Sequence, residues 1–462
     1  MTEKNVNQTN QTKPSLSDNV AASTKQASAT TARRAVLQSQ AGMQHSRRKF
    51  LQSATVATGV VAAGMPMVHA ASDSPIRVGL IGCGGRGTGA AVNAMKADPN
   101  VQIVALADLF GEAMDSCRTS LEKRYPAQFK VTDDTCYEGF DAYKQMVASD
   151  VDVVLLASPP HYRPDHIEAA VDGGKEIFCE KPVAVDAVGV RRVEAACKKA
   201  DEKGLNVVSG LCWRYDKGMK ETISRIQDGQ IGNIVSTQAD YLTSPVWIRP
   251  RREGDTQMQY ECRNWYYYNW LSGDHYVEQF IHSLDKAMWL RGDEPPVRAY
   301  GLGGRQNRSD LTQGNIYDHF AVIYEWADGT RTYANTRQIA GCFRQVEDFV
   351  FGSAGSAKLC AHEIEGSTPW KFKGDEVQMH QAEQNEFFKA LRGERARINN
   401  GDYMCKSTMM AILGREVCYT GGTLTYDEVA NGNQDLRPKS YTSTEGHAAP
   451  VPIPGEYKHP TA

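Results

Sequence analysis

The stretch "IRVGLIGCGGRGTGA", residues 76–90, runs from a short apolar segment directly into a glycine-rich turn. Gly82, Gly84 and Gly87 form the pattern Gly-x-Gly-x-x-Gly, which predicts a strand before the turn and a helix after it. Glycines at these positions let the backbone turn tightly and let a pyrophosphate approach the N-terminus of the helix. Asp108 ends the next apolar segment about 20 residues further along, where it can accept hydrogen bonds from an adenosine ribose. The stretch therefore predicts a dinucleotide-binding unit, with a glycine-rich turn that binds no ligand as the alternative.

The sequence favours NAD over NADP as the dinucleotide. Asp108 would repel the 2′-phosphate of NADP, and no arginine directly follows it. The loop residues that we expect to contact the cofactor are Gly82, Gly84, Gly85, Arg86 and Gly87.

The segments that follow alternate between apolar runs and amphipathic ones. Strands are predicted at "IRVGLI", "VQIVALAD", "VDVVLLAS", "KEIFCE" and "LNVVSGL", and helices at residues 85–98, 111–124, 165–173 and 186–203. Continuous runs rich in β-branched residues, separated by helices, are typical of a parallel sheet that is covered on both faces. Residues 75–211 are therefore predicted to be an α/β Rossmann domain with a doubly wound parallel sheet.

The pattern changes after residue 211. Longer segments of alternating polarity, such as "NIVSTQADYL", "FAVIYEWADG" and "TRTYANTRQI", predict half-solvated antiparallel strands. Two further helices are predicted at residues 376–391 and 403–419. We expect residues 212–445 to form an α+β domain with one large, open, mainly antiparallel sheet that serves substrate binding and oligomerisation, followed by a terminal arm at residues 446–462.

Two motifs follow strands of the first domain and should lie at the carboxyl edge of its sheet, where such folds bind ligands. In "ASPPHYRPDH", residues 157–166, we expect Ser158, Pro159 and His161 to line the cofactor cleft. In "CEKPVA", residues 179–184, Glu180 and Lys181 should contact the cofactor. A buried ammonium is costly unless it is paired. Lys181 is therefore predicted to act on a substrate oxygen, with a surface lysine that merely follows a strand as the alternative.

These three motifs, in this order, resemble the glucose-fructose oxidoreductase, inositol dehydrogenase and MocA (Gfo/Idh/MocA) family over nearly all of residues 75–445. The resemblance includes "GLCWRYDKGMKETISRIQDGQIGNIV", residues 210–235. It implies that Lys181 is the substrate-binding catalytic residue. The family pairs this lysine with an Asp and a His four residues apart, and another Asp three further on. That pattern falls on Glu278, His282 and Asp285, with Glu in place of the first Asp.

Roles for these residues follow from their chemistry. An imidazole with its ordinary pKa of about 6.5 can take a hydroxyl proton near neutral pH, so His282 is the predicted general base. We expect Glu278 to orient His282 or to accept a hydrogen bond from a substrate hydroxyl. Asp285 is expected to support the fold.

The stretch "HYVEQFIHSLD", residues 275–285, has two other interpretations. At helical spacing, His275, Glu278 and His282 could supply metal ligands from one face, or the stretch could be the solvated face of a helix. The family pattern explains these positions without a metal, so no metal site is predicted. The role of His275 stays unassigned.

The sequence thus predicts an enzyme that transfers a hydride between NAD and a ring hydroxyl of a sugar, glycoside or polyol. One alternative is an NAD-dependent glycoside hydrolase or eliminase of the same fold. Another is a non-catalytic sugar- or NAD-binding protein, because a fold does not fix a function. The aromatic passage "RNWYYYNW", residues 263–270, could contact sugars, lie in the core or form an oligomer contact.

The first 70 residues carry eight Lys or Arg and two acidic residues, although the whole chain of 462 residues has a net charge of −3. The paired arginines of "SRRKFLQ" precede the uncharged run "SATVATGVVAAGMPMV" and a small-residue site that ends at Ala70. This order predicts a twin-arginine export signal in residues 1–70, with recognition by the Tat machinery, a periplasmic or cell-envelope location and cleavage near Ala70. Because this route exports folded proteins, the NAD is expected to be tightly bound.

The rest of the composition excludes other classes of protein. The remaining chain is acidic and has no concentrated basic patch, which argues against nucleic-acid binding. The eleven cysteines contain no Cys-x-x-Cys pair and give little support to a disulfide framework or a structural zinc site. We expect a homo-oligomer that binds a small-molecule substrate.

Overall fold

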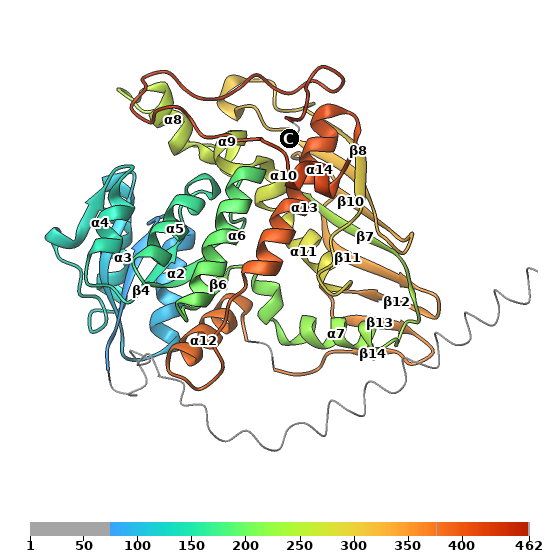
Figure 1. Cartoon of the computed structure of the whole chain (residues 1–462), viewed down its shortest axis with the longest axis horizontal. Helices are drawn as coiled ribbons and strands as arrows, with labels where there is room; N and C mark the ends of the chain where they lie inside the picture. The colour runs from blue at the N-terminus through green and yellow to red at the C-terminus, as the bar shows by residue number, and fades with distance from the viewer. Residues whose placement is uncertain (1–73, 376, 461–462) are drawn as a thin grey trace, which may run out of the picture. The chain divides into compact units, whose positions relative to one another are not determined.

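The computed structural model describes residues 74–375 and 377–460, and the predicted export signal lies outside them. Six parallel strands form the first sheet in the order β3-β2-β1-β4-β5-β6 (Figure 1). They are β1 (Ile76–Ile81), β2 (Val101–Asp108), β3 (Cys136–Glu138), β4 (Val153–Leu156), β5 (Glu176–Cys179) and β6 (Val207–Ser209). The predicted doubly wound parallel sheet is confirmed. The sequence did not predict the edge strand β3, because a strand of three residues, two half-buried and one exposed, is too short for a periodic signal.

Helices cover both faces of this sheet, which is why β4 is buried along its whole length. They are α2 (Gly85–Ala97), α3 (Gly111–Arg124), α4 (Ala142–Ala148), α5 (Arg163–Asp172) and α6 (Ala187–Glu202), with the short turns η1 (Asp133–Thr135) and η2 (Pro160–Tyr162). Strand β1 pairs with both β2 and β4, so the strand order reverses beside it. The glycine loop therefore lies at the switch point, where open α/β sheets bind their ligands.

The second sheet has nine strands in the order β14-β13-β12-β11-β7-β10-β9-β8-β15. Its only parallel pair is β7 with β10, so the prediction of a mainly antiparallel sheet is confirmed. The strands are β7 (Ile234–Thr243), β8 (Arg298–Gly304), β9 (His319–Glu325), β10 (Arg331–Gln338), β11 (Gln345–Gly352), β12 (Gly355–Lys358), β13 (Glu363–Gly366), β14 (Trp370–Lys371) and β15 (Thr423–Thr425).

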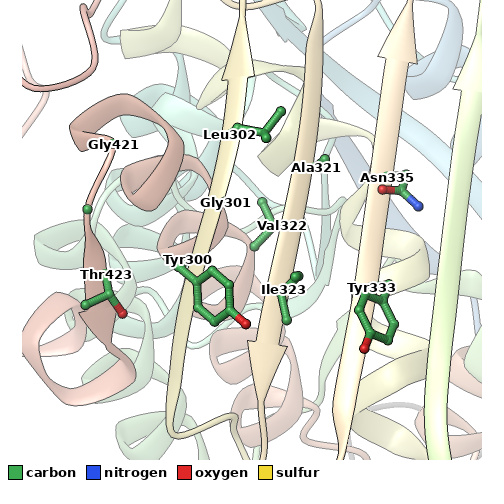
Figure 2. Close-up of a pocket in the computed structure, with 11 residues that line it drawn as sticks. Tyr300, Gly301, Leu302, Ala321, Val322, Ile323, Tyr333, Asn335, Gly421 and Thr423 are labelled. Atoms are coloured by element: carbon green, nitrogen blue, oxygen red, sulfur yellow. The ribbon is translucent and has the colours of Figure 1, made fainter. Parts of the chain in front are cut away.

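One face of the large sheet packs against helices and the other is exposed. The inner face contacts α11 (Ile281–Trp289) and the long, almost entirely buried α13 (Gly401–Thr420), with α10 (Asp274–Glu278) against α13. Ala334 of β10 points to this core, whereas Tyr333 is 41% exposed on the outer face. Side chains over β8 and β10, among them Tyr300, Leu302 and Tyr333 (Figure 2), line a hollow of about 530 Å³. Alternation along the strands separates this hollow from the helix-covered face.

The remaining helices include α7 (Lys217–Gln227), which leads from the first sheet to the second, and helices that lie between or after the strands of the second sheet. The latter are α8 (Gln257–Arg263), α9 (Asn269–Ser272), α12 (Met379–Leu391) and α14 (Tyr426–Ala430), and the short turns are η3 (Cys212–Tyr215), η4 (Trp265–Tyr267) and η5 (Leu311–Gln313). Helix α12 packs against α2 and η3, and Asn399 bridges to Val207 at the edge of the first sheet. The division of the chain at residue 211 stays a prediction, since these late segments belong spatially to the first sheet.

The chain after α14 returns across α8 and α9 (Figure 1), where the His447 ring lies 5.4 Å from the Trp270 ring. Within the described part of the chain, no helix combines the length and apolarity needed to span a membrane.

Candidate active site

The glycine loop between β1 and α2 leaves room for a ligand on one side and none on the other. Gly82 has a φ of 95°, and a Cβ there would lie 2.4 Å from the backbone nitrogen of Ser158. A Cβ on Gly87 would lie 1.8 Å from the carbonyl oxygen of Gly82. At Gly84 and Gly85, by contrast, a Cβ would meet nothing within 4 Å. The first and third glycines of the pattern are thus required by packing, and the middle of the loop faces open space at the N-terminus of α2.

Two features favour an anion at this helix end. Gly84 caps α2 without any side-chain hydrogen bond, so the first backbone N–H groups of the helix keep their capacity to donate. Arg86 lies in the first turn and adds a positive charge.

Asp108 ends β2 directly beside the loop. Its carboxylate accepts hydrogen bonds from the backbone N–H groups of Cys83, at 2.7 Å, and Phe110, at 3.0 Å. Burial raises the pKa of Asp108, and these backbone N–H groups oppose the shift. Each carboxylate oxygen has a second lone pair, so Asp108 can still accept hydroxyl hydrogen bonds.

The side chain of Lys181 makes a contact between the two domains at the centre of the site. It follows β5 at the carboxyl edge of the first sheet, and its Nζ donates to Glu278 at 2.9 Å from Oε1 and 2.6 Å from the backbone oxygen. Both side chains are largely buried, with 13% and 14% exposed. The structure therefore pairs the lysine of the first domain with the carboxylate of the second.

His282 lies close enough to this pair for the charge of Lys181 to affect it. Burial, followed by the positive charge of Lys181, holds the pKa of His282 well below 6.5. This corrects the expectation of an ordinary histidine pKa, which the sequence suggested because it does not show the surrounding cations. His282 is therefore uncharged at neutral pH, with a ring nitrogen free for a proton, and the same shift makes it a weaker base than an ordinary histidine.

The segment that carries Glu278 and His282 is not one continuous helix. Helix α10 ends at Glu278 and α11 begins at Ile281, because Phe280 donates its backbone N–H to His275 at 3.2 Å, five residues back. Glu278 bonds to Lys181, and Nδ1 of His282 has no hydrogen-bond partner. Glu278 thus contacts Lys181 here, and its predicted role, to orient His282 or to accept a hydrogen bond from a substrate hydroxyl, stays a prediction.

The other two ionisable residues of this segment serve the core. Asp285 binds Arg214 through Nε and Nη2, at 3.0 and 2.7 Å, which matches its expected role in the fold. His275 is buried, with Nδ1 2.9 Å from Asp274 and 3.1 Å from the carbonyl oxygen of Tyr317. Since His275 faces these groups, the segment does not gather the ligands that a metal site on it would need.

Comparison with known proteins agrees with this geometry. Residues 76–209 match the family model described as "Oxidoreductase family, NAD-binding Rossmann fold", and residues 219–358 match the GFO/IDH/MocA C-terminal domain. Together the two matches span more than half of the chain. The chain belongs to the Gfo/Idh/MocA oxidoreductase family.

Relatives of known sequence include the inositol 2-dehydrogenase of Rhizobium meliloti (strain 1021), 27% identical over 61% of this chain and 74% of that enzyme. Another is the 2,7-anhydro-N-acetylneuraminate hydratase of Escherichia coli (strain K12), 27% identical over 47% of this chain and 54% of that enzyme. The second of these matches thus spans only about half of the relative.

Solved structures establish the likeness in fold. The aldose-aldose oxidoreductase from Caulobacter crescentus complexed with glycerol aligns with a TM-score of 0.60 and 18% identity, over 76% of this chain and 99% of that one. GenD2 from gentamicin A biosynthesis, in complex with NAD, aligns with a TM-score of 0.58 and 17% identity, over 79% of this chain and 99% of that one.

As a Gfo/Idh/MocA oxidoreductase, the protein uses a nicotinamide dinucleotide, and its own residues fit NAD. The open backbone at Gly84 and Gly85 suits a pyrophosphate, and Asp108 suits a ribose with a free 2′-hydroxyl. Glu180 lies beside the loop and is held at 2.5 Å by Nε of Arg86. Burial acts against the charge of Glu180, but the positive charge of Arg86 lowers its pKa below the ordinary value.

The residues of "ASPPHYRPDH", which follow β4, make other contacts than those predicted from the sequence. The hydroxyl of Ser158 lies 3.1 Å from Nδ1 of His166, so Ser158 meets the glycine loop through its backbone, and Pro159 leads into η2. His161 is buried, with Nε2 2.7 Å from the hydroxyl of Tyr441 and its ring 4.9 Å from that of Trp270. Burial lowers the pKa of His161 to about 3, which keeps the ring uncharged. That these residues line the cofactor cleft stays a prediction.

Most aromatic side chains of "RNWYYYNW", residues 263–270, are buried in the core. Tyr266, Tyr267 and Trp270 are at most 3% exposed. Trp247, which the sequence reasoning did not single out, is 39% exposed and lies 5.9 Å from the ring of Trp265. A tryptophan in a loop of polar and charged residues was the signal that could have indicated it.

Proposed function

We propose that the protein oxidises a ring hydroxyl of a sugar, glycoside or polyol by hydride transfer to NAD. The observation that carries this proposal is the meeting of Lys181 with Glu278 beside an uncharged His282. It places a proton acceptor and a cation together at the carboxyl edge of the nucleotide-binding sheet.

The chemistry follows from what these groups can do. Lys181 donates hydrogen bonds to the substrate oxygen and stabilises the negative charge that grows on it. His282 takes the hydroxyl proton through a ring nitrogen that burial keeps unprotonated. Glu278 holds the ammonium of Lys181 in place and, once a substrate oxygen engages the lysine, can accept a second substrate hydroxyl. NAD, when bound, supplies the hydride acceptor.

A polyhydroxylated ring is the substrate class that the comparisons favour. The printed names of relatives include inositol 2-dehydrogenase, and a structural neighbour is an aldose-aldose oxidoreductase. Trp247 and Trp265 offer partly exposed aromatic faces of the kind on which sugar rings stack.

We further propose that the NAD is retained during turnover. The edge beyond Asp108 is covered by segments from later in the chain, because the Arg263 guanidinium lies 4.1 Å from the Phe110 ring and Arg252 binds Glu112 at 2.6 Å. The Tyr441 ring stacks on Phe140 at 4.7 Å. A dinucleotide whose adenosine lies beneath this cover would leave slowly.

Export by the twin-arginine route and assembly into a homo-oligomer are also proposals. The "SRRKFLQ" stretch supports export, which the replacement of Arg47 and Arg48 by lysines should block in a cell-fractionation experiment. Exposed apolar side chains on the outer face of the large sheet support assembly, among them Leu302 at 67% and Phe351 at 42% exposed.

The experiment that tests the function begins with the native protein. Denaturation should release NAD, identified by chromatography and mass, whereas released NADP would contradict the role given to Asp108. Addition of sugars and polyols to the intact protein should produce the near-ultraviolet absorbance of reduced nicotinamide. The Lys181→Met variant should lose this signal by roughly 10²-fold or more.

The matched control is Lys199→Met, since Lys199 is half-exposed and pairs only with Asp172 at the surface. Equal activity of the two variants would contradict the mechanism. Release of a sugar from a glycoside without any electron acceptor would instead support the hydrolase or eliminase alternative.

A further inference from the structure

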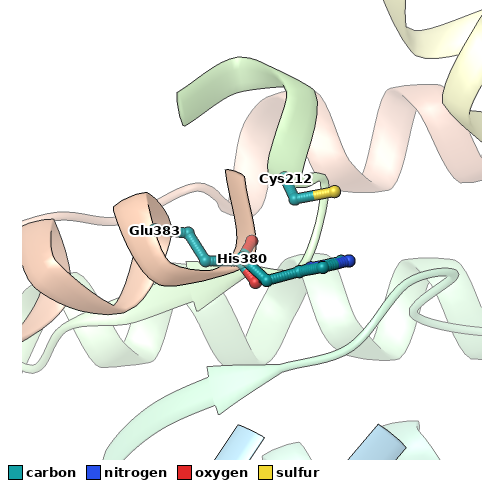
Figure 3. Close-up of side chains that lie close together, drawn as sticks. All are labelled: Cys212, His380 and Glu383. Carbon is teal, nitrogen blue, oxygen red and sulfur yellow. The ribbon is translucent and has the colours of Figure 1, made fainter. Parts of the chain in front are cut away.

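We propose that Cys212, His380 and Glu383 bind a divalent cation of the zinc type beside the cofactor cleft. Figure 3 shows these side chains converging from η3 and α12, and one donor atom from each lies within 4.8 Å of the other two. Within residues 74–375 and 377–460 this is the one such group of His, Cys, Asp and Glu donors. The sequence did not indicate it, because Cys212 is far from His380 in the chain and belongs to no Cys-x-x-Cys motif.

Local structure explains why the three donors meet. His380 and Glu383 are three residues apart on α12 and therefore share a face of that helix. Cys212 begins η3 directly after β6, and α12 packs against η3. The cluster thus lies at the same carboxyl edge of the first sheet as Glu180 and Lys181.

Glu383 provides the observation that points to a missing cation. Its side chain is fully buried, yet Oε2 has no hydrogen-bond partner among the residues that the structure describes. Oε1 has two long contacts, both at 3.3 Å, to Nη2 of Arg86 and Nδ1 of His380. The shorter contact of Arg86, at 2.5 Å, goes to Glu180. A buried carboxylate oxygen without a partner is expensive, and a metal ion at Oε2 would satisfy it while Arg86 stays at Oε1.

The charges around the cluster accommodate such an ion. Arg86 and Lys181 bring two positive charges, and Glu180 and Glu278, which pair with them, bring two negative ones. As metal ligands, the thiol of Cys212 and the carboxyl of Glu383 would each lose a proton and add two negative charges in all, which a divalent cation balances. Arg86 therefore does not prevent metal binding.

The donor set selects the kind of metal. One thiolate, one imidazole and one carboxylate are the ligands typical of Zn²⁺, whereas Mg²⁺ and Ca²⁺ prefer sites made of oxygen alone. Three protein ligands leave a fourth tetrahedral position for water, as in open rather than purely structural zinc sites. His380 keeps 28% of its side chain exposed, so the ion has an entry path.

Binding can be measured without any substrate. The full chain as purified, with its bound dinucleotide, is treated with a chelator, dialysed and titrated with Co²⁺ as a coloured substitute for Zn²⁺. Ligation by Cys212 should produce a thiolate-to-cobalt charge-transfer band that saturates at one ion per chain and disappears when Zn²⁺ displaces the cobalt. The Cys212→Ser variant should lack the band, and Cys342→Ser, which removes an exposed cysteine outside the cluster, should keep it.

A second variant covers the case in which Cys212→Ser does not fold. His380→Ala changes a partly exposed side chain and should weaken Zn²⁺ binding by roughly tenfold or more, measured by competition with a coloured chelator. The proposal is overturned if the wild-type protein shows no band, if the band survives in Cys212→Ser but is lost in Cys342→Ser, or if His380→Ala binds Zn²⁺ as tightly as the wild type.

Discussion

Replacement of Asp285 by alanine should destabilise the protein strongly while leaving the chemistry of the site intact. The side chain is 1% exposed and ties α11 to two other parts of the fold. It accepts from Nε and Nη2 of Arg214, at 3.0 and 2.7 Å, and from the hydroxyl of Ser407 at 2.7 Å. Removal of one partner of a buried ion pair typically costs about 3–5 kcal/mol, because the other charge is left buried.

The structure places the expected cost at the lower end of this range. Arg214 keeps a second carboxylate, Asp293, at 2.6 Å from Nη2, and its guanidinium lies 3.9 Å from the Tyr403 ring. The charge of Arg214 therefore remains partly compensated. The unpaired hydroxyl of Ser407 adds about 1 kcal/mol. We expect a loss of about 3–4 kcal/mol in the free energy of unfolding for Asp285→Ala, and a smaller loss for Asp285→Asn, which keeps the shape and one acceptor.

The assay is unfolding in urea, followed by circular dichroism and tryptophan fluorescence, with residual hydride transfer measured under native conditions. The control is Asp402→Ala, which removes an exposed carboxylate paired with Lys406 at 3.0 Å on α13 and should have little effect. If Asp285→Ala unfolds at the same urea concentration as this control, the structural role of the ion pair is refuted. If it unfolds normally but loses hydride transfer, Asp285 belongs to the chemistry rather than to the fold.

Three other outcomes are expected. An ordinary histidine base would lower kcat/KM for oxidation roughly tenfold when the pH falls to about 5.5. Because the pKa of His282 lies well below 6.5, the fall should be much smaller. A tenfold fall that is abolished in the His282→Gln variant would contradict this. Gly87→Ala should destabilise the protein in thermal unfolding, because its Cβ would be forced against the loop backbone. Gly85→Ala should fold normally but bind NAD less tightly, as measured by calorimetry. Equal stability of the two variants would count against the loop geometry. Asp108→Ser should weaken the binding of NAD and reduce its preference over NADP, measured by titration of both dinucleotides, and an unchanged preference would remove Asp108 from cofactor selection.

The fold of the first domain could be predicted from local patterns because its signals are continuous in the sequence. The apolar run of β1, the glycines after it and Asp108 at the end of β2 lie within one β-α-β unit, where spacing and backbone sterics dictate the turn. Strand β3 was missed because its three residues, two half-buried and one exposed, are too few to show a periodicity. The strands of the second sheet could also be predicted from their alternating polarity, since one face of the sheet is covered and the other is exposed.

Parts of the site that depend on distant partners could not be predicted in this way. The sequence suggested one helix through Glu278 and His282, but the structure has a break between Glu278 and Ile281, and Glu278 pairs with Lys181. The low pKa of His282 arises from burial, then from Lys181, which is far away in the sequence, and then from Lys286, which is only four residues on.

The sequence by itself determined the residue types of the chemistry and the backbone that carries the cofactor: the glycine loop, Asp108, Lys181 and His282. These signals are local, because steric limits and charge act on neighbouring residues. Only the tertiary structure decided which charges meet, that Lys181 pairs with Glu278 and that Cys212 approaches Glu383. The physical reason is that desolvation and Coulomb interactions depend on distance in space, and packing of the two sheets brings together residues that the sequence leaves far apart.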